Sequence, residues 1–363
     1  MSRALALVFT QGVSVEQWAA QGLLERERLP YQRLVKRGVG VLWFTYGAGD
    51  KRYEAELRGI EIVPMPRLFD SRLGRLAYSL LLPWVRAREF RRADTVKTNQ
   101  MKGAWSAVLA ARRHGKRLVV RTGYTWSLFP PAGLLDRLAP LVERWACAAA
   151  DEVQVTTESQ RAYLIARHRL APARVRVIPN FVDTARFSPA PALARRDDRV
   201  IFIGRLSAQK NLETLLAALA GTGLGLDLYG DGPLRERLEA RAAALGVPAS
   251  FHGRVSNAEL PAILNRHAVF VLPSLYEGFP KALLEAMACG LAVVAADAPG
   301  NRELVEHGRT GLLAAPTSGG LRAALISLQA DAALRGRLGQ AAATEASGRF
   351  SLESVAALEA HAR

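Results

Sequence analysis

Short apolar runs rich in valine, leucine and phenylalanine alternate along the chain with longer stretches whose apolar residues recur at helical spacing. This alternation is typical of parallel α/β sheets, because consecutive parallel strands are joined by crossover helices. It occurs in both halves, so the pattern predicts two doubly wound domains. The expected strands are residues 5–9, 41–46, 95–97, 118–120, 152–155 and 175–178, followed by 200–203, 226–229, 250–251, 269–272, 292–295 and 312–313.

The segment 180–198 follows neither the strand period nor the helix period. It contains Pro189, Pro191 and a cluster of charged residues, a composition typical of a linker. We therefore expect one domain over residues 1–184 and a second over residues 185–350.

Length and composition exclude several classes of protein. The chain has 363 residues, of which 50% are hydrophobic and 23% charged, so it is neither disordered nor fibrous. Its longest uncharged run, residues 122–135, has 14 residues and includes two prolines. A membrane-spanning helix needs about 20 apolar residues. The two cysteines, Cys147 and Cys289, stand in alanine-rich surroundings that predict buried thiols, which favours a reducing, cytoplasmic location.

The positive charge is concentrated in the first half of the chain. The net charge is +16: residues 1–185 hold 30 Lys and Arg against 16 Asp and Glu, a net of +14, whereas residues 186–363 hold 19 against 17, a net of +2. A general compositional bias towards arginine would affect both halves alike. We therefore favour an anionic partner for the first domain over a bias without a partner.

Residues 67–92 combine basic and apolar side chains at helical spacing. They include seven arginines against two acidic residues, with Leu80, Leu81, Leu82 and Trp84 between the basic clusters. Such a segment suits the interface of an anionic membrane, and equally a core helix with a solvated basic face. The sequence leaves these two interpretations open.

The richest chemistry follows the expected strand 269–272. A loop carries Glu277, Gly278 removes a side chain, and Pro280 suits the start of a helix. The backbone amides of Gly278, Phe279 and Lys281 would then stand at a helix N-terminus, which favours anions such as phosphate. The helix that follows is apolar nearly all round, so the carboxylate of Glu285 within it requires a polar partner, which is either a ligand hydroxyl or a structural group.

A second cluster follows the expected strand 200–203. Gly204 and Arg205 come directly after the strand, and Lys210 stands near the start of the next helix. Two cations in this position could bind a diphosphate and stabilise its departure as a leaving group. Because strands of a parallel sheet end at the same edge, this cluster and the Glu277 loop are expected to share one site.

These segments resemble glycosyltransferase family 4, a family of retaining enzymes with the GT-B fold and nucleotide-sugar donors. The resemblance rests on Glu277 with Glu285 eight residues later, on the Gly204–Arg205–Lys210 segment, and on an Asp-x2-Gly-x2-Glu pattern at residues 297–303. It covers about residues 175 to 315. It implies two Rossmann-like domains that face a central cleft, and a C-terminal helix over residues 351–363 that returns to the first domain.

The resemblance also implies roles for individual residues. Glu277 would contact the hydroxyls of the donor sugar, while Arg205 and Lys210 would bind the diphosphate; these three are the candidate catalytic residues. Glu285 would bind the ribose. The remaining candidate donor-binding residues are Gly12, Gly204, Arg254, Val255, Gly278, Phe279, Pro280 and Lys281.

The first half departs from the family pattern. Gln11–Gly12 stands where a Gly-Gly pair is usual, and Arg121 lies in the region where many members have a histidine. The acceptor site is therefore not transferable from the family. Our candidates for it, chosen from the expected strand ends, are Asn99, Arg121 and Tyr124.

We expect a hexosyltransferase that uses a UDP- or GDP-linked sugar and an acceptor hydroxyl on a lipid-linked or cell-surface glycan. The six histidines show no metal-ligand spacing, so neither a metal nor a cofactor is expected. No nucleic-acid motif is present. The charge asymmetry predicts peripheral attachment to the inner face of the plasma membrane. The alternatives are a GT-B enzyme with a soluble product, of phosphorylase or sugar-phosphate synthase type, and a non-catalytic basic membrane-binding protein.

Overall fold

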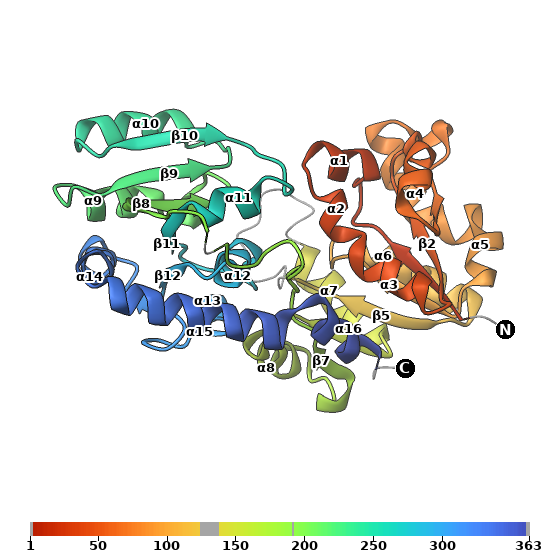
Figure 1. Cartoon of the computed structure of the whole chain (residues 1–363). Helices are drawn as coiled ribbons and strands as arrows, with labels where there is room; N and C mark the ends of the chain where they lie inside the picture. Colours follow the sequence, from red (N-terminus) through yellow and green to blue (C-terminus); the bar gives the residue numbers. More distant parts are fainter. Residues whose placement is uncertain (1–2, 124–137, 191, 361–363) are drawn as a thin grey trace. The chain divides into compact units, whose positions relative to one another are not determined.

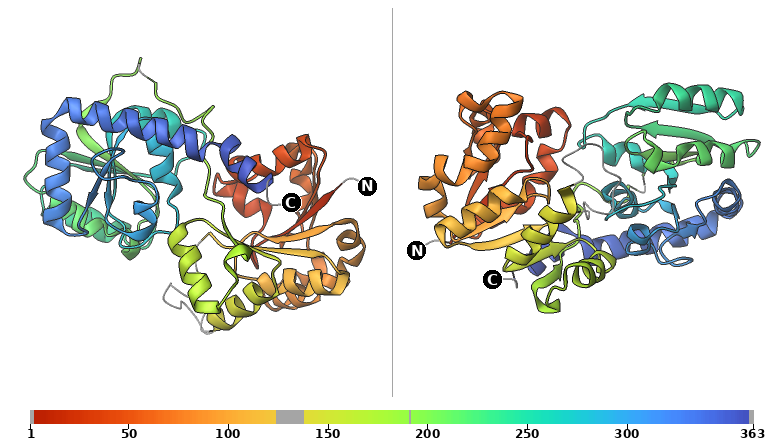
Figure 2. Two further views of the ribbon diagram at one scale, coloured as in Figure 1. Left: turned by 90° about the horizontal axis from the view of Figure 1, so that it is seen from below. Right: turned by 180° about the vertical axis from the view of Figure 1, so that it is seen from behind.

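A computed structural model describes residues 3–123, 138–190 and 192–360 of the chain (Figure 1). The chain forms two compact units, Met1–Ile178 and Pro179–Arg363, and each contains one sheet whose strands all pair in parallel. Figure 2 shows the same ribbon from two further directions.

The sheet of the first unit has seven strands in the order β3-β2-β1-β4-β5-β6-β7. The chain reverses its direction of growth between β1 and β4, so the carboxyl ends of these two strands form a topological switch point. The strands are β1 (Ala4–Val8), β2 (Gly40–Phe44), β3 (Ile60–Val63), β4 (Thr95–Thr98), β5 (Arg117–Arg121), β6 (Glu152–Val155) and β7 (Val175–Val177). The helices are α1 (Val15–Ala20), α2 (Leu24–Glu27), α3 (Leu29–Lys36), α4 (Arg72–Val85), α5 (Ala87–Arg92), α6 (Ala104–His114), α7 (Ala139–Ala149) and α8 (Glu158–His168).

The sheet of the second unit has six strands in the order β10-β9-β8-β11-β12-β13. This is the strand order of a dinucleotide-binding domain, with the switch point between β8 and β11. The strands are β8 (Arg196–Ile203), β9 (Gly225–Tyr229), β10 (Ala249–Gly253), β11 (His267–Leu272), β12 (Ala292–Ala296) and β13 (Leu312–Ala314). The helices are α9 (Leu212–Leu219), α10 (Arg235–Ala244), α11 (Leu260–Asn265), α12 (Lys281–Ala288), α13 (Pro299–Arg302), α14 (Ser318–Ala330), α15 (Ala332–Phe350) and α16 (Leu352–Ala360).

Burial explains why these strands could be predicted from the sequence. All five residues of β12 and all four of β6 are buried, because helices cover both faces of a parallel sheet. The predicted class, two Rossmann-like doubly wound domains, is confirmed, and every expected strand is present. The two cysteines, Cys147 and Cys289, are free and buried, and burial raises the pKa of each thiol to about 12.

The structure corrects two expectations. The strand β3 was not predicted, because its four residues include Glu61, whose carboxylate is held at the surface by Arg92 at 2.6 Å. The linker was predicted to extend through residue 198, but β8 already begins at Arg196. The amide of Arg196 donates to the carbonyl of Arg266 at 2.8 Å, which extends β8 beside β11 although its first residues are exposed.

The C-terminal segment is joined to the residues that follow the boundary between the units. The amide of Val182 donates to the carbonyl of Phe350 at 2.8 Å, and the amide of Leu352 donates to the carbonyl of Val182 at 3.1 Å. The helix α16 begins at this point. The return of residues 351–363 to the first domain stays a prediction, and residues 361–363 lie outside the described part of the chain.

Candidate active site

The two clusters of candidate residues in the second unit follow neighbouring strands. β8 and β11 are paired, and the loops that leave their carboxyl ends carry Arg205 and Lys210 on one side and Glu277 on the other. Both loops therefore lie at the switch point of the sheet, where ligands of doubly wound domains bind. Although the two clusters are separated by 67 residues of chain, the strand order brings them together.

Lys210 and Glu277 form an ion pair between these two loops. Their side chains are 16% and 9% exposed, so the pair is largely removed from solvent. Two further bonds join the same loops: Gln209 Nε2 donates to the carbonyl of Tyr276 at 2.8 Å, and the amide of Leu275 donates to the carbonyl of Gln209 at 3.0 Å. The ammonium and the carboxylate are thus held at fixed positions before any ligand binds.

Gly300 packs closely against the backbone that runs from Glu277 to Pro280. A Cβ atom at Gly300 would overlap the carbonyl oxygens of Glu277 and Gly278, so this position requires glycine. On the other side, Asn180 Nδ2 donates to the carbonyl of Phe279 at 2.8 Å, and the Phe279 ring packs edge-on against Phe350 at 5.3 Å. The loop therefore has a fixed conformation, and the carbonyl of Phe279 is engaged by Asn180.

The helix α12 begins directly after this loop. Pro280 occupies the N-cap position rather than the first turn, and the first helical bond runs from the amide of Leu284 to the carbonyl of Pro280 at 3.2 Å. The amides of the first turn lie outside the helical hydrogen-bond ladder, as in any helix. Together with the partial positive charge of the helix N-terminus, they favour an anion beside Lys210.

Glu285 is buried in the middle of α12 with 3% of its surface exposed. Its Oε1 atom accepts a hydrogen bond from Nδ2 of Asn257 at 3.3 Å, and Asn257 is itself 7% exposed. Asn257 follows β10 in the same loop as Arg254 and Val255, of which Arg254 is exposed and Val255 half-buried. A protein side chain is therefore among the partners of the Glu285 carboxylate, and the sequence analysis did not find this partner.

Glycines shape the strand ends beside the ion pair. The amide of Gly204 donates to the carbonyl of Tyr229 at 2.9 Å, and the amide of Gly230 donates to the carbonyl of Gly253 at 2.6 Å, so the ends of β8, β9 and β10 are linked in series. Gly230 has a φ of +133°, and a Cβ atom there would overlap the carbonyl of Gly204. Arg205 is exposed directly after Gly204.

The candidate residues of the first unit follow β1, β4 and β5, which are adjacent strands. Gly12 lies in a turn after β1 with a φ of +78°, and Asn99 Nδ2 donates to Thr10 Oγ1 at 3.4 Å. Arg121 ends β5, and its amide donates to Thr98 Oγ1 at 2.9 Å. The strand order thus brings Gly12, Asn99 and Arg121 to one edge of this sheet. Tyr124 lies outside the described residues.

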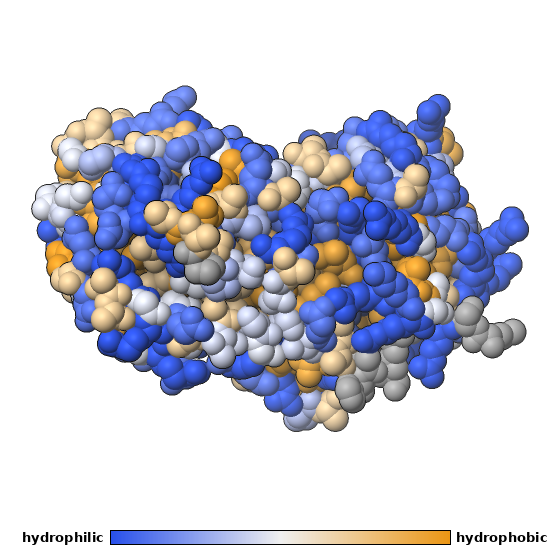
Figure 3. Space-filling model, viewed as in Figure 1, coloured by the Kyte–Doolittle hydropathy of each residue, from blue (hydrophilic) through white to orange (hydrophobic). Residues whose placement is uncertain are grey.

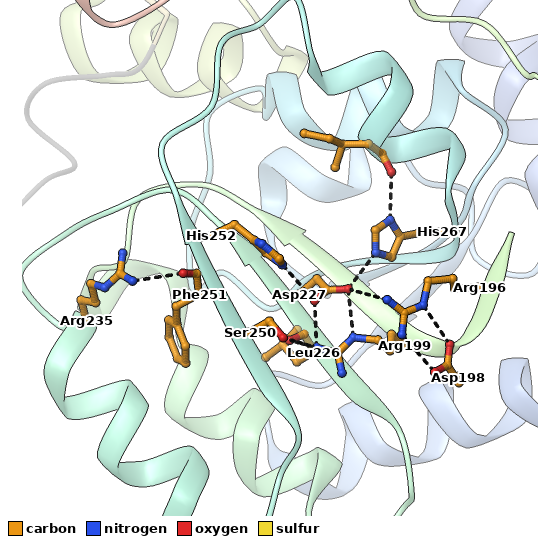
Figure 4. A network of polar contacts seen from close by, with 11 residues as sticks. Arg196, Asp198, Arg199, Leu226, Asp227, Arg235, Ser250, Phe251, His252 and His267 are labelled. Carbon is orange, nitrogen blue, oxygen red and sulfur yellow. Dashed lines mark hydrogen bonds and ion pairs between the residues drawn. The ribbon is translucent and has the colours of Figure 1, made fainter.

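A buried carboxylate of β9, that of Asp227, accepts hydrogen bonds from the imidazoles of His252 and His267 and from the guanidinium of Arg199 (Figure 4). The distances are 3.1 Å from His252 Nε2, 3.0 Å from His267 Nε2 and 2.8 Å from Arg199 Nη2. Burial by itself raises the pKa of Asp227, but the hydrogen bonds from His267, Arg199 and His252 hold it well below its usual range. This network joins β8, β9, β10 and β11, so these two histidines stabilise the packing of the sheet. Among the described residues, no group of three or more His, Cys, Asp or Glu is arranged to hold a metal ion.

Comparison with known proteins agrees with the motifs and the fold. Residues 183–345 match the family model "Glycosyl transferases group 1", and residues 31–186 match "Glycosyltransferase Family 4". The chain belongs to glycosyltransferase family 4. The two matches together cover both units, including the first half, where the sequence resemblance had given only the alternation of strands and helices.

Individual proteins show how far the similarity extends. Glycogen synthase of Mycobacterium tuberculosis is 31% identical over 237 residues, which are 62% of this chain and 56% of that protein. The chain thus spans about half the length of this curated relative. Sucrose-phosphate synthase of Thermosynechococcus elongatus superimposes with a TM-score of 0.79 at 21% identity, over 99% of this chain and 98% of that one. HepE of Anabaena, solved in complex with UDP and glucose, gives 0.77 at 22% identity over 99% of both chains. The GT-B fold is therefore confirmed.

Sequence reasoning missed Asn257, which lies two residues after the candidate donor-binding residue Val255, and the contact that Asn180 makes. Neither contact has a local signal, because each joins residues far apart in the chain. Asn180 ends an Ile-Pro-Asn sequence at residues 178–180, and nothing in that sequence shows that its amide contacts the Phe279 loop.

Proposed function

We propose that this protein transfers a hexosyl group from a nucleoside-diphosphate sugar to an acceptor hydroxyl, with retention of configuration at the anomeric carbon. The observation that carries the proposal is the Lys210–Glu277 pair beside the N-terminus of α12. It places a cation, a carboxylate and the amides of a helix start at one switch point, which suits the diphosphate and the sugar hydroxyls of a single donor.

Each part of the donor then has a partner in the second unit. Lys210 and Arg205 bind the diphosphate, and the amides at the start of α12 add hydrogen bonds to it. Glu277 accepts hydrogen bonds from sugar hydroxyls, and Glu285 accepts them from the ribose. The segment that includes Arg254 and Val255 lies along the base. Of the candidate donor-binding residues, Gly12 alone belongs to the first unit.

The protein accelerates the reaction by positioning the donor and by stabilising charge. As the glycosidic bond to the phosphate breaks, negative charge grows on the leaving diphosphate, and Lys210 and Arg205 are held where they offset it. Glu277 is assigned to hydroxyl binding, so we do not propose it as a nucleophile.

The acceptor, we propose, is part of a lipid-linked or cell-surface glycan reached at an anionic membrane. The support is a surface formed by α4 and by the short helix Arg67–Phe69 that precedes it. Its apolar side chains, all exposed, are Leu68, Leu73, Leu80, Leu81, Trp84 and Val85. Leu68 and Leu73 are 84% and 80% exposed, and Trp84 is 51% exposed. Most of the surface visible in Figure 3 is hydrophilic, so one helix with this many exposed apolar side chains is unusual.

The helix α4 carries apolar side chains both on its buried face and on its exposed face. Tyr78 and Leu82 on its inner face belong to the core of the first unit. The opposite face is apolar rather than basic, which differs from the solvated basic face of the alternative interpretation. Among the residues that lie around it, Arg72, Arg88 and Arg91 are exposed, and the Arg113 guanidinium lies 5.5 Å from the centre of the Trp84 ring. This arrangement suits insertion of apolar side chains beneath anionic headgroups that the arginines contact.

Not every arginine of this segment serves equally well. Arg75 is paired with Asp70 at 2.8 Å, Arg92 with Glu61 at 2.6 Å, and Arg86 with Glu89 at 3.5 Å. Arg72, Arg88 and Arg91 are therefore the better candidates for lipid contact. None of the helices within the described ranges is both long enough and apolar enough to cross a membrane.

Two experiments test the proposal. The first measures thermal shifts with UDP-, GDP- and ADP-sugars, followed by donor hydrolysis and transfer. A donor at 100 times its dissociation constant raises stability by about 2.7 kcal/mol. No shift with any of them would contradict the proposed donor class, and binding without hydrolysis or transfer would favour a non-catalytic protein.

The second experiment is vesicle co-sedimentation. Binding should require anionic lipid, fall at high salt, and weaken both for Leu80→Gln with Trp84→Gln and for Arg88→Ser with Arg91→Ser. Arg75→Ser, whose arginine is paired with Asp70, is the matched control and should bind like the wild type. Equal binding to neutral vesicles, or none to anionic ones, would favour the alternative of a soluble product.

A further inference from the structure

The loop that follows β10 is fixed by a reciprocal set of hydrogen bonds. The amide and the hydroxyl of Ser256 donate to Glu259 Oε2 at 2.9 and 2.6 Å, and the amide of Glu259 donates to the carbonyl of Ser256 at 3.1 Å. This turn leads directly into α11 and holds Asn257 within it. The backbone that carries Asn257 is therefore held by its own loop.

The Asn257 side chain is directed at the carboxylate of α12. Its Nδ2 atom lies 3.3 Å from Glu285 Oε1, and both residues are buried. Six of the eight residues of α12 are buried, so a carboxylate there needs fixed donors. One amide hydrogen on Oε1 also restricts rotation of the carboxylate, which sets the direction of its remaining lone pairs.

We propose that Asn257 is a positioning residue for ribose recognition. Its amide orients the Glu285 carboxylate so that the ribose hydroxyls meet an acceptor whose direction is already fixed. Because Asn257 lies two residues after Val255, the same side chain joins the part of the site that lies along the base to the part that binds the ribose. This inference rests on the proposed function, in which Glu285 binds the ribose.

A purely structural asparagine would make the same contact, so the test needs a readout that stability does not change. That readout is the ratio of two dissociation constants: that of the 2′,3′-dideoxynucleoside diphosphate divided by that of the ribonucleoside diphosphate. The base is whichever of uracil, guanine or adenine the wild-type protein binds best. A loss of folded protein affects both constants equally and leaves the ratio unchanged.

The wild-type ratio should be at least about tenfold, the discrimination that one hydrogen bond to a charged group supplies. Glu285→Gln should reduce it to a few-fold. Asn257→Ala should reduce this ratio several-fold, toward the ratio measured for Glu285→Gln. The ratio for the double variant should equal that for Glu285→Gln alone, since Asn257 acts through Glu285. Asn257→Ser gives the same test if the alanine variant does not fold.

The matched control is Ser256→Ala, which removes the Ser256 hydroxyl but keeps the bond from the Ser256 amide to Glu259 and the Asn257 amide that contacts Glu285. Its ratio should equal that of the wild type. A wild-type ratio in Asn257→Ala and Asn257→Ser, or an equal loss in Ser256→Ala, would overturn the role assigned to the Asn257 amide. Failure of the wild-type protein to bind any nucleoside diphosphate would instead contradict the proposed function.

Discussion

Replacement of Lys210 by alanine tests the proposed diphosphate site most directly. In the free protein the Lys210 ammonium is paired with the Glu277 carboxylate, and both side chains are largely buried. A donor would bring a diphosphate with at least two negative charges to the same ammonium. We therefore expect Lys210 to interact more strongly with the donor than with Glu277, and most strongly as charge develops on the leaving group.

The size of the effect follows from this geometry. A hydrogen bond to a charged group contributes about 1.5–3 kcal/mol, which corresponds to about 10- to 150-fold. Since Lys210 exchanges one anionic partner for another, the loss on removing it should lie nearer the lower limit for donor binding and be larger for kcat. We expect kcat/KM for the donor to fall by at least about tenfold.

The same substitution leaves the Glu277 carboxylate buried without the ammonium of Lys210. An unpaired buried charge is destabilising, so Lys210→Ala should lower the free energy of unfolding. Lys210→Ala combined with Glu277→Gln should recover part of this stability but none of the activity. Lys210→Arg keeps the charge and is the control for volume.

The assay is steady-state transfer with varied donor, together with chemical denaturation of each variant. Wild-type kinetics in Lys210→Ala would show that the diphosphate binds elsewhere. Recovery of transfer in the double variant would refute the reasoning in another way, because it would mean that Lys210 serves only to neutralise Glu277.

Four further outcomes are expected. Glu285→Gln should keep the fold while the affinity for free nucleotide falls by about tenfold, and unchanged affinity in a titration would leave Glu285 a structural role only. Transfer should persist in EDTA, because the proposed diphosphate site consists of cationic side chains and a helix N-terminus; complete loss that Mn²⁺ or Mg²⁺ restores would contradict this account of the phosphate site. Asn180→Ala should raise the KM for donor by roughly 2- to 10-fold, the effect of one neutral hydrogen bond, while a lower melting temperature with an unchanged KM would indicate a role in stability alone. Asp227→Asn should lower the free energy of unfolding at pH 7. The difference in unfolding free energy from the wild type should shrink as the pH falls below about 4, because a carboxylate whose folded-state pKa is depressed stabilises the fold only while it is ionised. A difference that is constant from pH 7 to pH 3 would argue against this ionic role.

The alternation of apolar runs was sufficient to predict both sheets. A strand buried on both faces is mostly apolar, so β12 can be predicted without any tertiary information. The short strand β3 was not predicted from the sequence because it lies at the edge of its sheet, where Glu61 can remain at the surface in an ion pair with Arg92. The sequence also placed the Glu277 loop and the Lys210 loop at strand ends, since polar residues and glycine directly follow apolar runs there.

Which of these residues meet was decided by the tertiary structure. Lys210 and Glu277 are 67 positions apart and pair only because β8 and β11 are neighbours at the switch point of the sheet. The contact between Asn257 and Glu285 depends in the same way on how the loop after β10 approaches α12. That α4 leaves apolar side chains exposed on its outer face could not be read from its sequence either, because apolar residues lie on all sides of the helix and the sequence does not show which of them the core will cover. Local composition therefore determines where a strand or helix forms and what chemistry stands at its end, whereas the order of the strands determines which of those ends share a site.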